Sequence, residues 1–134
     1  MPPQDRTRSL QGLRILLVED SDDVRELLTF LLGTDGAEVR AAPCARAAVG
    51  VAVGWDFDVL LTDIGLPDVA GNELIREILG MKTSRPRVVV MTGFGEPHIG
   101  LVRRAGADAV FTKPLEWSDL REQLALCHPA ALAA

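Results

Sequence analysis

Five short apolar segments recur along the chain, with room for a helix between each pair. They cover residues 14–18, 38–42, 58–62, 87–92 and 109–112. Their length and their content of leucine and β-branched residues favour strands. Three of them are almost continuously apolar, which is typical of parallel strands covered on both faces. The segment 38–42 is the most polar and carries charges, so we expect it at an edge of the sheet.

Amphipathic segments separate the predicted strands. After Ser21, a good helix N-cap, Asp22 and Asp23 fall in a first turn where the helix dipole favours acidic residues. An apolar stripe at helical spacing follows and is expected to be buried, comprising Val24, Leu27, Leu28, Leu31 and Leu32. Further helices are predicted near 44–53 and 71–81, from 96–97 onwards, and over 117–127 with Leu120 and Leu124 inward.

Strand and helix therefore alternate five times. Right-handed crossovers between parallel strands place helices on both faces of one sheet, so the pattern predicts an α/β fold with a five-stranded parallel sheet. We expect a single domain over residues 12–128, preceded by a tail or linker at 1–11 and followed by a short tail at 129–134.

Composition narrows the class of protein. The chain has 134 residues with 48 % hydrophobic residues, and no apolar run approaches the roughly 18 residues of a membrane span. The net charge of −5 argues against a dedicated nucleic-acid binder. The start of the chain lacks the apolar stretch of a signal peptide, so a cytoplasmic location is expected. Cys44 and Cys127 match no metal-binding spacing and are expected to be reduced thiols.

Polar residues with useful chemistry follow the predicted strands. In an open α/β sheet, ligands bind beyond the carboxyl ends of the strands. The first strand ends in Glu19 and Asp20, the third in Asp63, the fourth in Thr92, and the fifth runs into Lys113. The second strand offers nothing comparable. We therefore expect three acids, one hydroxyl and one lysine along one rim.

Three carboxylates at one rim need a cation or a proton. Two unit charges about 4 Å apart repel by about 4 kcal/mol at an effective dielectric of about 20. Oxygen ligands without nearby histidine or cysteine favour Mg²⁺, which commonly takes a phosphate oxygen as a further ligand. Lys113 and Thr92 would then contact the same phosphoryl group. Asp63 beside a cation and a lysine is a plausible nucleophile towards phosphorus.

These motifs resemble the receiver domain of two-component response regulators. The resemblance rests on Glu19-Asp20, on "DIGLP" at Asp63, on "MTG" at Thr92 and on "FTKP" at Lys113, and it runs from about residue 13 to 126. It implies a flavodoxin-like, doubly wound sheet with strand order 2-1-3-4-5. It also implies a signalling domain rather than an enzyme. Such a domain would phosphorylate and dephosphorylate only itself. The sequences of these motifs are most similar to those of receivers attached to hybrid histidine kinases.

The resemblance also implies roles for individual residues. Asp63 would accept a phosphoryl group from the phosphohistidine of a histidine kinase or phosphotransfer protein. Glu19, Asp20, Asp63 and the backbone carbonyl of Gly65 would hold Mg²⁺.

Further roles follow from the same resemblance. Thr92 and Lys113 would contact the phosphoryl oxygens, and the Lys113–Pro114 peptide would be cis. Thr92 and Phe111 would form a switch, in which a shift of Thr92 opens space for the aromatic ring. The fourth helix, fifth strand and fifth helix would then form the face that binds a downstream protein.

Three alternatives to this function remain open. A flavin carrier of the same fold would need a glycine- and hydroxyl-rich phosphate loop after the first strand, where this chain has "EDSDD". A phosphatase with a strand-end aspartate nucleophile would usually have an acid at position 65, where this chain has glycine. A receiver-like module could bind partners without phosphorylation, although the complete set of site residues argues against it.

Overall fold

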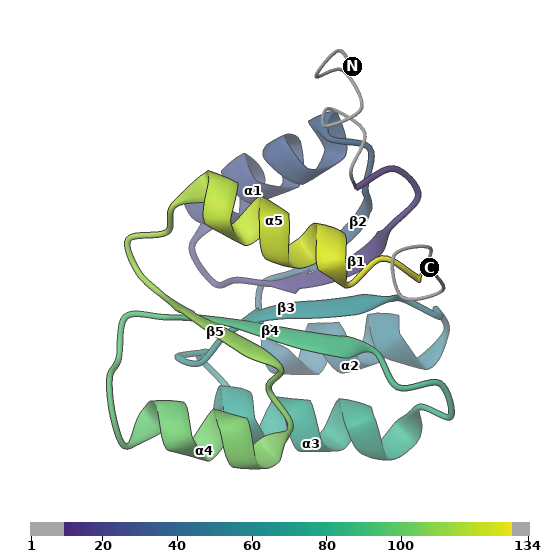
Figure 1. Cartoon of the computed structure of the whole chain (residues 1–134). Helices are drawn as coiled ribbons and strands as arrows, with labels where there is room; N and C mark the ends of the chain where they lie inside the picture. The colour runs from purple at the N-terminus through teal and green to yellow at the C-terminus, as the bar shows by residue number, and fades with distance from the viewer. Residues whose placement is uncertain (1–9, 130–134) are drawn as a thin grey trace.

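Strands and helices alternate along the chain in the computed structural model, which describes residues 10–129 (Figure 1). The strands are β1 (Arg14–Val18), β2 (Glu38–Ala42), β3 (Val59–Asp63), β4 (Arg87–Thr92) and β5 (Ala109–Thr112). The helices are α1 (Asp22–Thr34), α2 (Ala45–Val53), α3 (Gly71–Met81), α4 (His98–Ala105) and α5 (Trp117–Leu126). The element order agrees with the predicted pattern, and the boundaries agree to within two residues; β3 begins and ends one residue later than predicted.

All four strand pairings in the sheet are parallel. The order is β2-β1-β3-β4-β5, which confirms the predicted doubly wound topology. The charged strand β2 lies at an edge, as its composition predicts. Every residue of β3 is buried, so the central strand holds the residue at its end in a fixed place.

Two layers of helices enclose the sheet. Helices α1 and α5 cover one face, and α2, α3 and α4 cover the other (Figure 1). Alternate strand residues supply the two cores, because side chains on a strand point to opposite faces in turn. In β3, Leu60 belongs to the α2–α3–α4 side and Leu61 to the α1–α5 side. Leu120 and Leu124 of α5 are fully buried, as predicted.

The apolar stripe of α1 is only partly buried, which corrects the prediction. Leu28 and Leu32 pack against the sheet, whereas Leu27 is 56 % exposed. Leu28 and Leu32, which lie four residues apart, cover the sheet. Their neighbours in the stripe point into the gap between α1 and α5. This gap is an apolar groove of about 300 Å³. It is lined by Val24, Leu27, Leu28, Leu31, Lys113, Pro114, Leu115, Trp117 and Leu120.

The two ends of the described chain meet at the edge of the sheet where the strands begin. Leu10 is fully buried in the core beneath α1 and α5, although the predicted N-terminal tail includes it. The carbonyl oxygen of Gln11 lies 2.7 Å from Nε2 of His128. Of the predicted tails, residues 1–9 and 130–134 lie outside the described residues.

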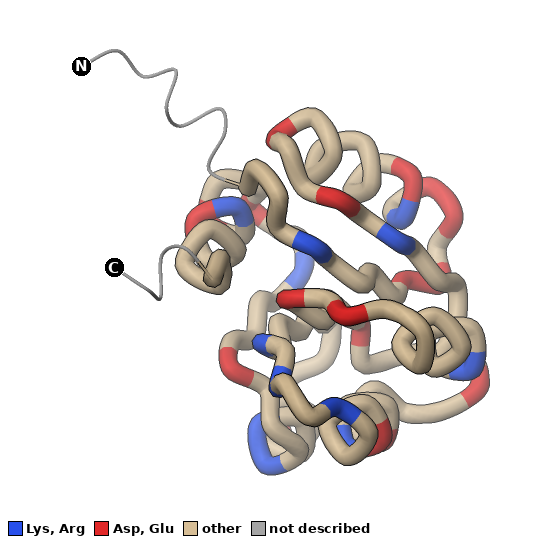
Figure 2. Tube along the Cα trace, turned by 90° about the vertical axis from the view of Figure 1, so that its right-hand side faces the viewer, with Lys and Arg blue, Asp and Glu red and all other residues tan. Residues whose placement is uncertain are grey.

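Acidic and basic positions are interspersed along the described trace (Figure 2). Among the described residues, no helix is long and apolar enough to cross a membrane.

Helix α2 receives its N-terminal cap from a distant residue. Cys44, the residue before the helix, makes no side-chain cap, and the carboxylate of Asp68 takes that role from the loop after β3. Its two oxygens accept hydrogen bonds from the backbone amides of Ala45 (3.0 Å) and Arg46 (2.9 Å). The amide of Arg46, followed by that of Ala45, lowers the pKa of Asp68. The cap therefore ties the loop that follows Asp63 to α2.

We expect Asp68→Ala to lower the melting temperature at neutral pH, because two amides at the start of α2 lose their acceptor. The folded-state pKa of Asp68 is depressed, so the stability it contributes is present above its unfolded pKa and is lost as pH falls through the lower folded value. Thermal melts across the acidic range should show the variant and the wild type converging. Glu122→Ala, which removes an exposed carboxylate on α5, is the control. An equal difference at all pH values would contradict the assignment.

Candidate phosphorylation site

The chemistry-bearing residues gather at the carboxyl edge of the sheet, as their strand-end positions predict. Asp63 is the last residue of β3 and Thr92 the last of β4, while Glu19 follows β1 and Lys113 follows β5. The Lys113–Pro114 peptide is cis, as predicted.

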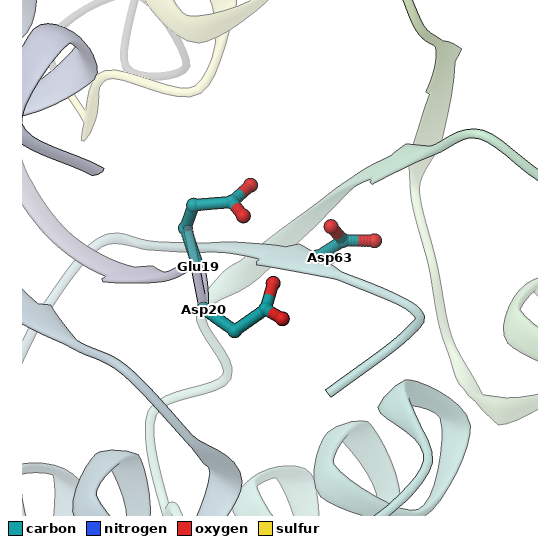
Figure 3. Close-up of side chains that lie close together, drawn as sticks. All are labelled: Glu19, Asp20 and Asp63. Carbon is teal, nitrogen blue, oxygen red and sulfur yellow. The ribbon is translucent and has the colours of Figure 1, made fainter. Parts of the chain in front are cut away.

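Three carboxylates form a cluster at this edge. One oxygen from each of Glu19, Asp20 and Asp63 lies within 4.8 Å of the other two. Figure 3 shows the first two side chains beyond β1 and the third at the end of β3. Glu19 and Asp63 are only 1 % and 6 % exposed, whereas Asp20 is exposed. The cluster therefore has two buried acids and one that faces water.

Lys113 neutralises part of this charge. Its ammonium group donates to Oδ2 of Asp63 at 2.7 Å and to Oε1 of Glu19 at 3.3 Å. Burial alone would lower the pKa of Lys113, but the hydrogen bond to Asp63 and the charges of both acids outweigh it and raise that pKa. The lysine is therefore held in its charged form beside Asp63.

Glu19 experiences opposing influences. Burial raises its pKa above the usual range, while the amide of Ser21, which donates to its Oε2 at 3.0 Å, and the charge of Lys113 act in the other direction. One lysine faces three acids, so the described cluster retains excess negative charge. A cation at this edge would reduce the remaining repulsion.

The backbone around Asp63 fixes the direction of its carboxylate. The amide of Gly65 donates to Oδ1 of Asp63 at 3.2 Å. A Cβ atom at Gly71 would lie 2.8 Å from the carbonyl oxygen of Asp63, so glycine is required for α3 to begin this close to the strand end. The carboxylate is therefore held between an amide on one side and Lys113 on the other.

The hydroxyl of Thr92 is engaged with the loop that follows it. Its oxygen accepts from the amide of Phe94 at 2.8 Å and donates to the carbonyl oxygen of the same residue at 3.3 Å. Thr92 itself is fully buried. Phe94 was not singled out from the sequence; its signal is an aromatic residue in the loop two positions after Thr92.

The structure contradicts the predicted coupling of Thr92 with Phe111. Phe111 pairs with Met91 in the sheet and packs on the α1–α5 side. Thr92 is the next residue along β4 and points to the opposite face, which it shares with Val90 and Val110. A shift of Thr92 therefore opens space beside Val110 rather than beside Phe111.

The donor set fits a hard divalent cation. Carboxylate oxygens are the ligands that Mg²⁺ prefers, and the described cluster brings three of them together without sulfur or imidazole. The exposed position of Asp20 leaves room for the water ligands that Mg²⁺ usually keeps.

Comparisons with known proteins agree with this arrangement. A family model of the response regulator receiver domain matches residues 15–125. The chain is 34 % identical over 113 residues to the response regulator protein PilR of Pseudomonas aeruginosa, which covers 84 % of this chain and 25 % of PilR. It is 32 % identical over 107 residues to the transcriptional regulatory protein FixJ of Azorhizobium caulinodans, covering 79 % of this chain and 50 % of FixJ. The chain thus spans a quarter to a half of these relatives.

Solved structures show the same fold. A receiver domain protein from Methanospirillum hungatei superposes with a TM-score of 0.80 at 29 % identity, covering 85 % of this chain and 91 % of that one. The response regulator TrrA of Thermotoga maritima, solved in complex with Mg²⁺ and BeF, gives a TM-score of 0.78 at 27 % identity, covering 87 % and 99 %. The family model matches most of the chain, and both the described fold and the acidic cluster at the strand ends agree with it. The chain therefore belongs to the receiver domains of two-component response regulators.

Proposed function

We propose that Asp63 accepts a phosphoryl group from the phosphohistidine of a histidine kinase or a phosphotransfer protein. One observation carries the proposal: the buried carboxylate of Asp63 ends the central strand, is held by Lys113, and lies beside two further acids. A nucleophile in a receiver domain needs this combination of fixed position and nearby positive charge.

In the proposed transfer, an oxygen of Asp63 forms a bond to phosphorus while the bond between phosphorus and the donor nitrogen breaks. The imidazole keeps the electron pair of that bond. Lys113 holds the attacking carboxylate before transfer and stabilises the phosphoryl oxygens afterwards, and Thr92 donates a hydrogen bond to one of them. When bound by Glu19, Asp20, Asp63 and the carbonyl of Gly65, Mg²⁺ supplies further positive charge. TrrA, a relative of the same fold, was solved in complex with Mg²⁺ and BeF, which supports metal binding by this domain.

The domain acts as a phosphorylated signal rather than as an enzyme on other substrates. Self-phosphorylation from small donors and hydrolysis of its own phosphoaspartate are its only proposed reactions. Its proposed partners are a phosphohistidine donor and a downstream protein. The domain itself contacts neither nucleic acid nor membrane, and its proposed location is the cytoplasm. We propose that it works either alone in a phosphorelay or as the receiver of a hybrid histidine kinase.

Intact-mass spectrometry tests the function directly. The protein should gain one phosphoryl group when it is incubated with acetyl phosphate and Mg²⁺, and much less when the metal is chelated. No adduct under either condition would leave a module that binds partners without phosphorylation. Unchanged absorbance and fluorescence of added FMN, together with no turnover of a phosphomonoester, would dismiss the flavin carrier and the phosphatase.

We further propose that phosphorylation alters the face formed by α4, β5 and α5. The hydrogen bond from the Thr92 hydroxyl to the carbonyl oxygen of Phe94 must break before that hydroxyl can donate to a phosphoryl oxygen. Phe94 lies in the loop that leads into α4. The effect is a population shift, limited by how differently the phosphoryl group contacts the two states. This path runs through the loop after β4 and past Val110, and it does not use Phe111.

Beryllofluoride, a mimic of the phosphoryl group, should therefore shift backbone amide resonances over residues 93–105 and along β5. The measurement is a comparison of amide spectra with Mg²⁺ alone and with Mg²⁺ plus beryllofluoride. Shifts restricted to the immediate surroundings of Asp63 would show that the domain binds the mimic without switching, and would refute the proposed partner face.

A further inference from the structure

Arg25 lies near the start of α1, close to the acidic cluster, and the proposed transfer gives it no role. Its side chain is only 20 % exposed. Arginine side chains are mostly exposed unless they are paired, so the partners of this one indicate what it does.

The guanidinium of Arg25 joins the start of α1 to the end of β1. Its Nη1 donates to the backbone carbonyl oxygen of Glu19 at 2.9 Å, and its Nη2 donates to the carboxylate of Asp22. The amide of Glu19 donates in turn to the carbonyl oxygen of Ala42 on β2 at 3.1 Å. The backbone of Glu19 is therefore held from two sides, by β2 through its amide and by Arg25 through its carbonyl.

Asp20 depends on this backbone for its position. Its carboxylate is exposed, and no residue within 10–129 forms a hydrogen bond with it. The other two acids of the cluster are buried, and both accept from Lys113. The carbonyl that Arg25 holds belongs to the peptide that joins Glu19 to Asp20. Because a peptide unit is planar, a fixed oxygen also fixes the direction in which the chain enters Asp20.

We propose that Arg25 is a positioning residue for Mg²⁺, which holds the Glu19–Asp20 peptide so that the Asp20 carboxylate lies beside that of Asp63 before the metal binds. This inference rests on the proposed function, because it assumes the same metal site. A ligand atom that is already in place costs less entropy to bind than one that must first be ordered. Loss of the Arg25 hydrogen bond therefore weakens the binding of Mg²⁺, although Arg25 does not touch the metal.

Electrostatics alone predicts the opposite sign. Arg25 is positively charged, so its removal leaves the surroundings of the cluster more negative, and this change by itself tightens the binding of a cation. Weaker binding in a variant that lacks the charge therefore indicates positioning.

MgCl₂ titrations followed by backbone amide resonances, without any phosphoryl donor, test the inference. Arg25→Ala should raise the dissociation constant of Mg²⁺ several-fold. Arg25→Lys keeps the charge and one donor group, so its value should lie between those of Arg25→Ala and wild type. Arg76→Ala removes an exposed arginine from α3 and should match wild type. If Arg25→Ala does not fold, Arg25→Met takes its place, because it keeps an apolar stem but has no donor.

The dependence of phosphorylation on Mg²⁺ provides a second readout. With acetyl phosphate, Arg25→Ala should form the adduct more slowly than wild type when Mg²⁺ is scarce, and at the wild-type rate when Mg²⁺ saturates the site. A rate that stays low at saturation would overturn a role confined to the placement of Asp20.

An unchanged or lower dissociation constant in Arg25→Ala, or in Arg25→Met where it replaces it, would overturn the positioning role and leave Asp63 as the acceptor. A wild type that neither binds Mg²⁺ nor forms an adduct would overturn the proposed function and this inference together.

Discussion

Asp63→Asn should abolish the phosphoryl adduct that the wild type forms with acetyl phosphate and Mg²⁺. An amide oxygen is a poor nucleophile, and no other described acid combines an end position on the central strand with the hydrogen bond from Lys113. Intact-mass spectra recorded side by side provide the measurement. The substitution keeps the size of the side chain and an oxygen that can accept from the amide of Gly65, so the fold should remain intact.

Asp56→Asn is the matched control for this experiment. Asp56 is exposed and lies just before β3, at the opposite edge of the sheet from Asp63. The same chemical change there should leave the adduct at the wild-type level. An undiminished adduct in Asp63→Asn would show that another residue carries the phosphoryl group.

Asp20→Ala should remove the stabilisation that Mg²⁺ gives to the wild type. A ligand at about ten times its dissociation constant stabilises the folded state by about 1.4 kcal/mol, which corresponds to a shift of a few degrees in a domain of this size. In Asp20→Ala this shift should disappear, and phosphorylation should be lost with it. Without metal, the melting temperature should equal or exceed that of wild type, because Asp20 is exposed and its removal relieves repulsion from Glu19 and Asp63.

Asp23→Ala makes the same change of charge in the first turn of α1, outside the carboxylate cluster. It should retain the response to Mg²⁺, as measured by thermal melts with and without the metal. If Mg²⁺ stabilised Asp20→Ala as much as wild type, the cluster would not be the metal site.

The residues at the carboxyl edge could be predicted because their position depends only on the topology of the sheet. Once the alternation of strands and helices indicates a parallel sheet, the residues after β1, β3, β4 and β5 must share one edge. Among the residues at this edge, the acids and the lysine are then recognised as site candidates by their residue type. No packing detail is needed for this step, which explains why Glu19, Asp63 and Lys113 were found from the sequence and meet as expected.

Side-chain direction was harder to predict than position. Phe111 lies in β5, whose residues are all half-buried or exposed, so its apolar pattern does not reveal which side chains face which layer. The register with β4 settles the question by pairing Phe111 with Met91. Likewise, the stripe on α1 gives no sign that Leu27 would be left in a groove, because that depends on the distance between two helices.

Contacts between loops were missed for a related reason. Asp68 and Phe94 both lie in connecting segments without periodicity, and each acts on a residue far along the chain. Asp68 caps α2, and Phe94 rests on Gly65. Composition alone marks such residues as loop residues, and only the three-dimensional arrangement reveals their partners.

The meeting of Gln11 with His128 has a practical consequence for experiments on this domain. Both ends of the described chain leave the fold at the edge where the strands begin, so a fluorescent protein or an affinity handle joined at either end starts away from Asp63. Energy transfer between labels at the two ends should report on unfolding with little sensitivity to phosphorylation. A shortened version must keep Leu10, because the fully buried leucine belongs to the core. Its removal would expose apolar surface beneath α1 and α5.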